Sequence, residues 1–120
     1  MTKTAFLFAG QGAQYLGMGR DLYDRYPIVK ETIDQASQVL GYDLRDLIDK
    51  EETKLNQTRY TQPAILATSV AIYRLLKEKG YQPDMVAGLS LGEYSALVAS
   101  GALDFEDAVA LVAKRGAYME

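Results

Sequence analysis

Two short apolar runs stand between longer segments in which apolar residues recur every three or four positions. The first run, residues 4–9 (TAFLFA), stops at a glycine and is typical of a buried parallel strand followed by a functional loop. The second run, residues 84–89 (DMVAGL), is also predicted to be a strand. Each run precedes a glycine-containing turn, so the two strands are expected to present loops at the same edge of a sheet.

The remaining pattern is helical along most of the chain. Helices are predicted over residues 20–26, 27–40, 43–48 and 61–79, after Ser90-Leu91-Gly92 as far as residue 100, and from 105 to the last residue, 120. Pro27 suits the first position of the second helix, and Gly41 and Gly80 are expected to end the helices that precede them. The segment from Glu51 to Tyr60 is polar enough to be predicted as a surface connection.

The apolar positions of these helices predict which faces are buried. One side of the second helix carries Val29, Ile33, Ala36 and Leu40, and one side of the last helix carries Phe105, Ala108, Val109 and Val112. Helix 61–79 has apolar residues around most of its circumference, so it is expected to be largely buried. Asp104 is predicted to cap the last helix, with Asp107 as its partner three residues later.

Two strands connected by helices predict an α/β fold with parallel strands and crossover helices. A parallel sheet of two strands is too small to stand alone, because both of its edges need further partners. After Gly116, the last helix shows no further glycine or proline that would end it. We therefore expect these 120 residues to be one part of a larger folded unit, with the remainder of the same chain as a partner.

Composition removes several classes of function. Thirteen Lys and Arg residues against 16 Asp and Glu residues give a net charge of −3 with no basic run, which disfavours nucleic-acid binding. The absence of cysteine and histidine excludes a disulfide framework, a Cys/His zinc site and a histidine base within this chain. No stretch resembles a signal peptide or a membrane span, so we expect a cytoplasmic protein that does not contact a membrane.

The strongest chemical motif is Gly88-Leu89-Ser90-Leu91-Gly92, a G-x-S-x-G between a predicted strand and a predicted helix. In this context the glycines permit a sharp turn that exposes the serine hydroxyl. The start of the next helix also directs backbone N–H groups toward a developing oxyanion. The sequence favours Ser90 as a nucleophile, and the alternative is a tight turn in which Ser90 only caps the helix.

The loop Gly10-Gln11-Gly12 follows the first strand and has three possible roles. It could bind a dinucleotide, but the spacing continues into Tyr15 rather than glycine, and no acidic residue ends a second strand about twenty residues later. It could instead bring the backbone N–H of Gln11 to the Ser90 turn as a second oxyanion donor. The third possibility is a simple glycine-rich turn.

Arg115 lies at the edge of the apolar stripe of the last helix when positions are counted at about 100° per residue, whereas Lys114 lies on the opposite face. An arginine at a core boundary needs an anion, which could be a structural Asp or Glu or the carboxylate of a substrate. Glu93 follows Ser90 in the first helical turn and could either complement the helix dipole or orient a neighbouring group.

Taken together, these segments strongly resemble the amino-terminal part of bacterial malonyl-CoA:acyl carrier protein transacylase. The resemblance runs over nearly the whole chain from Thr4, and the order of its motifs is highly specific. The matching segments are FLFAGQGAQYLGMG (6–19), YTQPA (60–64), GLSLGEYSALVASGAL (88–103) and AVALVAKRG (108–116).

The resemblance implies a role for five residues. Ser90 would be the nucleophile that becomes malonylated, and the backbone N–H groups of Gln11 and Leu91 would form the oxyanion hole. Arg115 would bind the free carboxylate of the malonyl group, and Gln62 would line the same pocket. The histidine that family members pair with the serine would lie far beyond residue 120.

The fold implied is the first part of an α/β-hydrolase-like large subdomain, with a ferredoxin-like subdomain and the histidine-bearing remainder outside this chain. The activity implied is malonyl transfer from coenzyme A to acyl carrier protein in fatty-acid biosynthesis, with no metal or redox cofactor. The segment alone is expected to be inactive.

One residue departs from the family pattern, since Leu89 stands where the family commonly has histidine before the serine. We expect it to tune the pocket rather than abolish transfer. Two alternatives stay open: a serine thioesterase or hydrolase, in which water takes the acyl group, and a non-catalytic fragment that binds the acyl-thioester. The second alternative predicts exposed apolar surface on the isolated chain.

Overall fold

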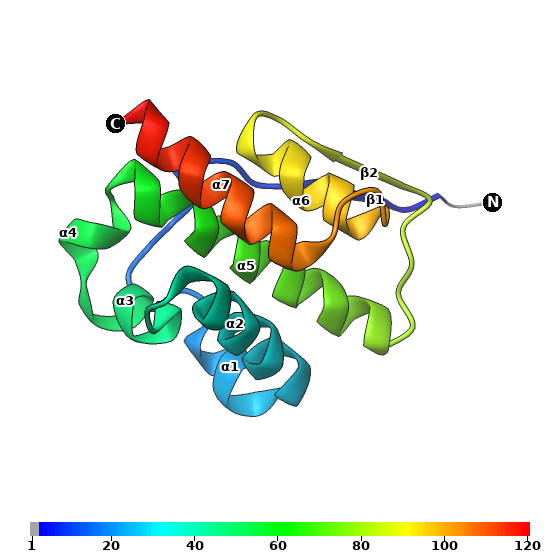
Figure 1. Cartoon of the computed structure of the whole chain (residues 1–120). Coiled ribbons are helices and arrows are strands. Elements are labelled where there is room, and N and C mark those ends of the chain that lie inside the picture. The colour runs from blue at the N-terminus through cyan, green and yellow to red at the C-terminus, as the bar shows by residue number, and fades with distance from the viewer. Residues whose placement is uncertain (1–2) are drawn as a thin grey trace.

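The computed structural model describes residues 3–120, which form seven helices and a pair of strands at one side of the molecule (Figure 1). The elements are β1 (Ala5–Phe8), α1 (Arg20–Arg25), α2 (Pro27–Leu40), α3 (Leu44–Lys50), α4 (Glu52–Leu55), α5 (Thr58–Glu78), β2 (Met85–Gly88), α6 (Leu91–Ala99) and α7 (Phe105–Met119). The α/β class and both predicted strands are confirmed. Each strand is one residue shorter at both ends than the apolar run that predicted it.

The strands β1 and β2 pair in parallel, with Ala5 opposite Met85 and Phe8 opposite Gly88. Helices α1–α5 form the crossover between them. Because parallel strands end at the same edge, the loop after β1 and the turn after β2 come out side by side. This edge carries the candidate chemistry.

The prediction that strand 4–9 is buried is wrong for the residues described. Exposed and half-buried residues alternate along β1, and Leu7 keeps 81% of its surface exposed. Phe6 and Phe8 point the other way and pack edge-on against Tyr73 of α5, with ring centroids 6.1 and 6.2 Å apart. Within residues 3–120, only one face of the sheet is covered by helices, which explains the alternation.

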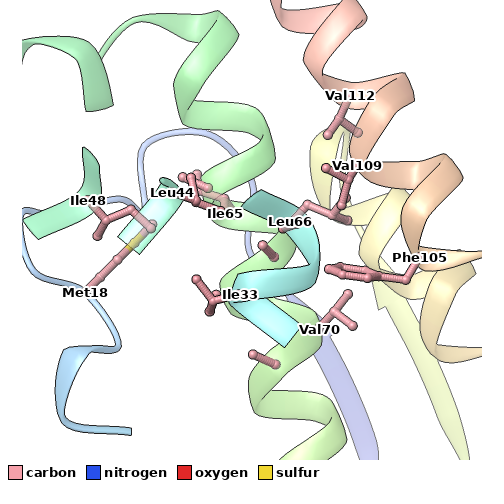
Figure 2. Packing of buried hydrophobic residues seen from close by; sticks show 14 of the residues in the cluster. Met18, Ile33, Leu44, Ile48, Ile65, Leu66, Val70, Phe105, Val109 and Val112 are labelled. Atoms are coloured by element: carbon pink, nitrogen blue, oxygen red, sulfur yellow. The ribbon is translucent and has the colours of Figure 1, made fainter. Parts of the chain in front are cut away.

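The core lies between α5, α7 and α2 (Figure 2). The predicted stripes are confirmed, since Val29, Ile33 and Ala36 of α2 and Phe105, Ala108, Val109 and Val112 of α7 are all buried. Leu40 is partly buried and packs against the same core. The long helix α5 passes through this layer and contributes Ile65, Leu66, Ala67, Val70 and Leu75. This complete helical layer is the platform on which the end of α7 is positioned.

The predicted surface connection from Glu51 to Tyr60 is wrong. Residues 52–55 form the short helix α4, and α5 begins at Thr58, three residues earlier than expected. Leu55 is completely buried, and the Thr61 hydroxyl donates to the Leu55 carbonyl. One apolar side chain is therefore enough to pull an otherwise polar segment onto the core.

The predicted helix ends agree with the structure. Gly41 adopts a left-handed φ of 81° and donates its N–H to the Ser37 carbonyl at the end of α2. The Asp104 carboxylate accepts from the Glu106 and Asp107 backbone N–H groups at 3.1 and 3.4 Å, which confirms the cap of α7. Among residues 3–120, no helix is long and apolar enough to cross a membrane.

Candidate active site

Ser90 occupies a strained turn between β2 and α6. Its φ of 57° and ψ of −115° make it the only residue other than glycine with a positive φ in the described part of the chain. A backbone in such a region costs about 1–3 kcal/mol and persists only where its surroundings enforce it. Ser90 is exposed and its side chain makes no cap hydrogen bond to α6, so the helix-capping alternative is wrong.

The flanking glycines explain how the turn is enforced. A Cβ on Gly88 would lie 2.1 Å from the carbonyl atoms of Gly92, and a Cβ on Gly92 would lie 2.3 Å from the Phe8 carbonyl oxygen. The backbones of β1, β2 and α6 therefore meet at a spacing that admits no side chain. The predicted sequence of strand, sharp turn and helix is confirmed, including the reason for both glycines.

The backbone N–H groups at the start of α6 differ in whether they have an acceptor. The N–H groups of Gly92 and Glu93 donate to the carbonyls of Leu89 and Ser90, whereas that of Leu91 has no acceptor among residues 3–120. The loop after β1 lies beside the same turn, since a Cβ on Gly10 would stand 3.3 Å from the Leu89 carbonyl oxygen. The structure thus brings the Gln11 loop next to the serine turn.

The Gln11 loop does not have the geometry of a dinucleotide-binding loop. In that arrangement a helix begins directly at the glycines, but α1 starts only at Arg20. The Gln11 side chain instead donates to the Thr58 hydroxyl at 3.1 Å, at the start of α5. The dinucleotide alternative is therefore wrong for this loop.

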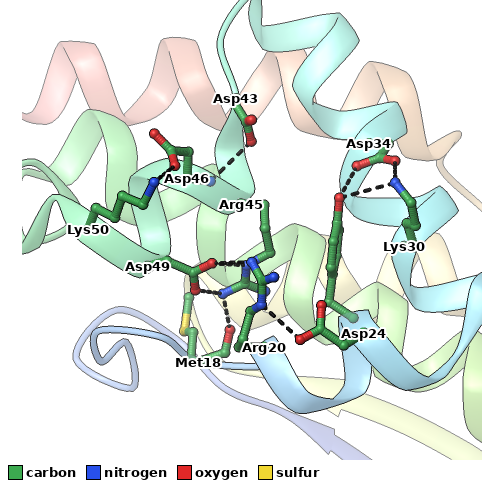
Figure 3. Close-up of polar contacts among 11 residues, drawn as sticks. Met18, Arg20, Asp24, Lys30, Asp34, Asp43, Arg45, Asp46, Asp49 and Lys50 are labelled. Carbon is green, nitrogen blue, oxygen red and sulfur yellow. Dashed lines mark hydrogen bonds and ion pairs between the residues drawn. The ribbon is translucent and has the colours of Figure 1, made fainter.

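The far end of this loop is anchored by α3 (Figure 3). Gly17 donates its N–H to the Ile48 carbonyl at 2.8 Å, and the buried Arg45 guanidinium donates to the Met18 carbonyl at 2.7 Å. Arg45 also pairs with Asp49 at 2.7 Å. Burial alone raises the pKa of Asp49, but hydrogen bonds from Arg45 and Arg20 outweigh it and hold that pKa below its ordinary value.

Arg115 reaches the serine from α7. Its Nη2 donates to Ser90 Oγ at 3.1 Å, and its Nη1 donates to Gln62 Oε1 at 3.0 Å. Arg115 is half-buried while Lys114 is exposed, as the helical phase predicted. None of the ion pairs found within residues 3–120 includes Arg115, so a structural Asp or Glu partner is ruled out for the described chain.

The Gln62 side chain is completely buried and contacts Arg115 on the side away from solvent. Its Oε1 accepts from Arg115, and its Nε2 contacts the Met119 sulfur at 3.1 Å. Glu93 is placed in the first turn of α6 and is exposed, a position that suits the helix dipole. Four sequence-predicted residues therefore gather at the end of β2: Ser90, Leu91, Arg115 and Gln62.

Two neighbours of Arg115 escaped the sequence reasoning. The guanidinium lies 5.5 Å from the ring centroid of Tyr94, within the range of a cation–π contact. Met119 closes the other side of Gln62. The sequence spacing could have indicated both residues. Tyr94 lies four residues after Ser90 and Met119 lies four residues after Arg115, and residues four apart share one helix face.

The arrangement suits acyl transfer at a serine. It combines an exposed hydroxyl on a strained turn, backbone N–H groups beside it, and a guanidinium with further N–H donors free for an anion. Within residues 3–120, no group of three His, Cys, Asp or Glu side chains could hold a metal ion.

Comparisons with known proteins agree with this chemistry. The model of the acyl transferase domain family matches residues 5–120. A malonyl CoA-acyl carrier protein transacylase of Haemophilus influenzae is 56% identical over 123 residues, which cover 100% of this chain and 39% of that protein.

Solved structures give the same result. The crystal structure of MCAT from Streptococcus pneumoniae is 94% identical with a TM-score of 0.97, and the match covers 98% of this chain and 39% of that one. A malonyl-transacylase solved in complex with a type II PKS acyl-carrier protein is 51% identical with a TM-score of 0.94, again over 98% and 39%. The chain thus spans about two fifths of the length of the relatives it matches.

Proposed function

The chain belongs to the acyl transferase domain family, and on this premise we propose that its protein transfers a malonyl group from coenzyme A to acyl carrier protein through an ester on Ser90. The observation that carries the proposal is the 3.1 Å contact between Arg115 Nη2 and Ser90 Oγ. It places a permanent cation beside the only hydroxyl that the fold holds in a strained, exposed turn within residues 3–120. Such a pair suits an acyl group that carries its own carboxylate.

In the first half of the reaction, Ser90 Oγ attacks the thioester carbonyl carbon of malonyl-CoA. A C–O bond forms, the C–S bond breaks, and the coenzyme A thiolate leaves. The serine proton passes to a general base and from there to the departing sulfur. The N–H groups of Leu91 and Gln11 stabilise the oxyanion while the carbonyl carbon is tetrahedral.

The base is not in this chain, which contains no histidine. We place it, together with a ferredoxin-like subdomain, in the part of the protein that corresponds to the remaining length of the relatives. Loss of the base removes orders of magnitude in rate, so we propose that the 120-residue segment alone does not turn over.

Arg115 selects the acyl group. One Nη donates to Ser90 and the other to Gln62, which leaves further N–H donors for the free carboxylate of malonyl. A planar guanidinium can bind a carboxylate through two parallel hydrogen bonds. A neutral acetyl group offers no such partner, so the pocket distinguishes the two by charge.

In the second half of the reaction, the phosphopantetheine thiol of acyl carrier protein is the acceptor of the malonyl group, as water would be in a hydrolase. Its sulfur attacks the ester carbonyl, a C–S bond forms, and the C–O bond to Ser90 breaks. The thiol proton returns through the base to Ser90 Oγ. The coenzyme A thioester is thus a substrate rather than a cofactor, and the proposed reaction needs no metal or redox cofactor. The setting we propose is cytoplasmic fatty-acid biosynthesis.

The proposal is tested by mixing the full-length protein briefly with malonyl-CoA and measuring intact and peptide masses. We expect a malonyl adduct on the peptide that contains Ser90 and none in Ser90→Ala. A folded wild-type protein without an adduct would contradict the covalent mechanism, provided that rapid quenching also finds none.

The acylated protein is then divided between buffer and buffer that contains acyl carrier protein with its phosphopantetheine arm. Transfer predicts that the adduct persists in buffer and moves to the carrier. Equal loss of the adduct in both samples, with free malonate as the product, would identify a thioesterase instead.

A further inference from the structure

We propose, building on the function proposed above, that Gln62 is a positioning residue that sets the preference of the site for an anionic acyl group. Its buried amide oxygen orients Arg115, and because the amide is uncharged it leaves the guanidinium charge for the substrate carboxylate. Gln62 would act through Arg115 rather than by touching the reacting atoms.

The position of Gln62 leaves it little freedom. Its side chain is completely buried on α5, and its Oε1 accepts from Arg115 Nη1 at 3.0 Å. Its Nε2 meets the Met119 sulfur at 3.1 Å, a weak acceptor. The strongest partner of the amide is therefore the guanidinium, and the buried packing fixes the direction from which that bond comes.

The charge of the acceptor matters as much as its direction. Three arginines of the described chain pair with carboxylates: Arg45 with Asp49, Arg20 with Asp24 and Asp49, and Arg59 with Glu120. Arg115 has a neutral amide and a hydroxyl as its hydrogen-bond acceptors, as does Arg74, which bonds Gln35 and Thr32. A glutamate at position 62 would neutralise the guanidinium and compete with an incoming carboxylate.

A close helix contact brings the two residues together. A Cβ on Gly116 would lie 2.7 Å from the Thr58 carbonyl oxygen and 2.8 Å from Arg59 Cα, so α7 approaches the backbone of α5 directly at this turn. Thr58 and Gln62 are four residues apart on α5 and share one face. Gly116 therefore sets the separation at which Arg115, its neighbour in sequence, meets Gln62.

The test uses the full-length protein and two probes. The first is malonate, compared with its uncharged analogue malonamide, whose affinities are measured by calorimetry without any turnover. The second is the ratio of the acylation rates of Ser90 by malonyl-CoA and acetyl-CoA. The variants are Gln62→Met, which keeps the volume and removes the acceptor, and Gln62→Glu, which adds a charge. The matched control is Gln35→Met, which breaks a similar 3.2 Å bond from Arg74 away from Ser90.

We expect Gln62→Met to weaken malonate binding about tenfold, because it removes a hydrogen bond to a charged group. Gln62→Glu should weaken it by a factor on the order of 100, because the cation is then neutralised. The malonyl-to-acetyl ratio should fall in the same order, while Gln35→Met keeps the wild-type ratio. In an Arg115→Ala background the Gln62 variants should change nothing further.

The proposal is overturned if malonate affinity is the same in wild type, Gln62→Met and Gln62→Glu, or if wild type binds malonate no better than malonamide. It is also overturned if the Gln62 effects persist without Arg115. Malonate binding does not require formation of the ester on Ser90. A protein that binds malonate selectively but forms no adduct on Ser90 would therefore contradict the proposed transferase function and leave the role of Gln62 standing. If Gln62→Glu fails to fold, Gln62→Met decides the question.

Discussion

The two sides of the candidate site rest on very different supports. The α5–α7 side, which carries Gln62 and Arg115, stands on a closed core in which Leu66 and Val109 are completely buried. The β1–β2 side, which carries Ser90, stands on two strands whose outer face leaves Leu7 and Met85 exposed by 81% and 63%. The guanidinium is thus positioned by side-chain packing, whereas the serine is positioned by backbone contacts that exclude a Cβ.

This difference separates two sources of precision. The strained φ of Ser90 is imposed by the tight meeting of Gly88, Gly92 and Phe8, and it does not need a filled core beneath it. The location of Arg115 depends on the packing of two long helices, so it should respond to core mutations far from the site. Each prediction below damages one side and leaves the other intact.

The largest effect is expected where the turn has no room. Gly88→Ala places a Cβ 2.1 Å from the Gly92 carbonyl, so β2 and α6 must move apart. We expect a loss of stability of about 3 kcal/mol, measured by urea unfolding, and loss of Ser90 acylation in the full-length protein. Gly10→Ala is the milder comparison, since its Cβ would stand 3.3 Å from the Leu89 carbonyl oxygen, a tight contact that a small shift relieves, so it should cost less than Gly88→Ala. Wild-type stability and wild-type acylation of Ser90 in Gly88→Ala would show that this contact does not set the turn.

The two supports can be compared directly by truncating one leucine in each. Leu66→Ala opens a cavity in the fully buried core and should cost about 2–5 kcal/mol. Leu7→Ala changes an exposed side chain and should cost no more than about 0.5 kcal/mol in the 120-residue chain. Denaturant unfolding of both variants decides the comparison. Equal costs would mean that the outer sheet face is covered in solution.

The anchor of the Gln11 loop should respond to acid. Since the pKa of Asp49 lies below its ordinary value in the folded chain, its contribution to stability is complete above the ordinary value of 3.8 and is lost as the pH falls through the lowered pKa. Wild type should lose stability on acidification more steeply than Asp49→Asn. Urea unfolding at about pH 5 and about pH 3 measures the two slopes, and parallel slopes would contradict the assignment.

The smallest effect concerns the start of α7. Asp104→Ala removes the acceptor for the N–H groups of Glu106 and Asp107 and should cost about 1 kcal/mol. The frayed end lies far from Arg115 along the helix, so the malonyl preference should stay the same. Asp107→Ala keeps both acceptor bonds and serves as the control. An Asp104→Ala protein with wild-type stability and an altered malonyl preference would contradict this assignment.

The sequence predicted the helical side of the site better than the sheet side. The stripe of α7, the cap at Asp104 and the half-buried phase of Arg115 follow from spacing alone. The exposure of the strands does not follow from spacing, because the burial of Leu7 depends on which elements cover the sheet. Apolar runs predict that a strand can be buried on both faces, and they do not say that a second layer is present.

Other features needed three dimensions. The α4 segment was missed because a single apolar residue, Leu55, gives no period, although it is completely buried. The contact of Gly116 with Thr58 could only be suspected from a glycine inside an otherwise regular helix. That Arg115 would meet an amide rather than a carboxylate was not visible from spacing, since Gln62 lies more than fifty residues away.

The most direct test of the account is the acyl preference of the full-length protein without its central cation. Acylation of Ser90 by malonyl-CoA and by acetyl-CoA is measured in Arg115→Ala and, as a matched control, in Lys114→Ala, which removes the neighbouring exposed cation. We predict that Arg115→Ala loses the preference for malonyl while Lys114→Ala keeps it. An Arg115→Ala protein that still prefers malonyl would contradict the assignment of Arg115 as the carboxylate partner.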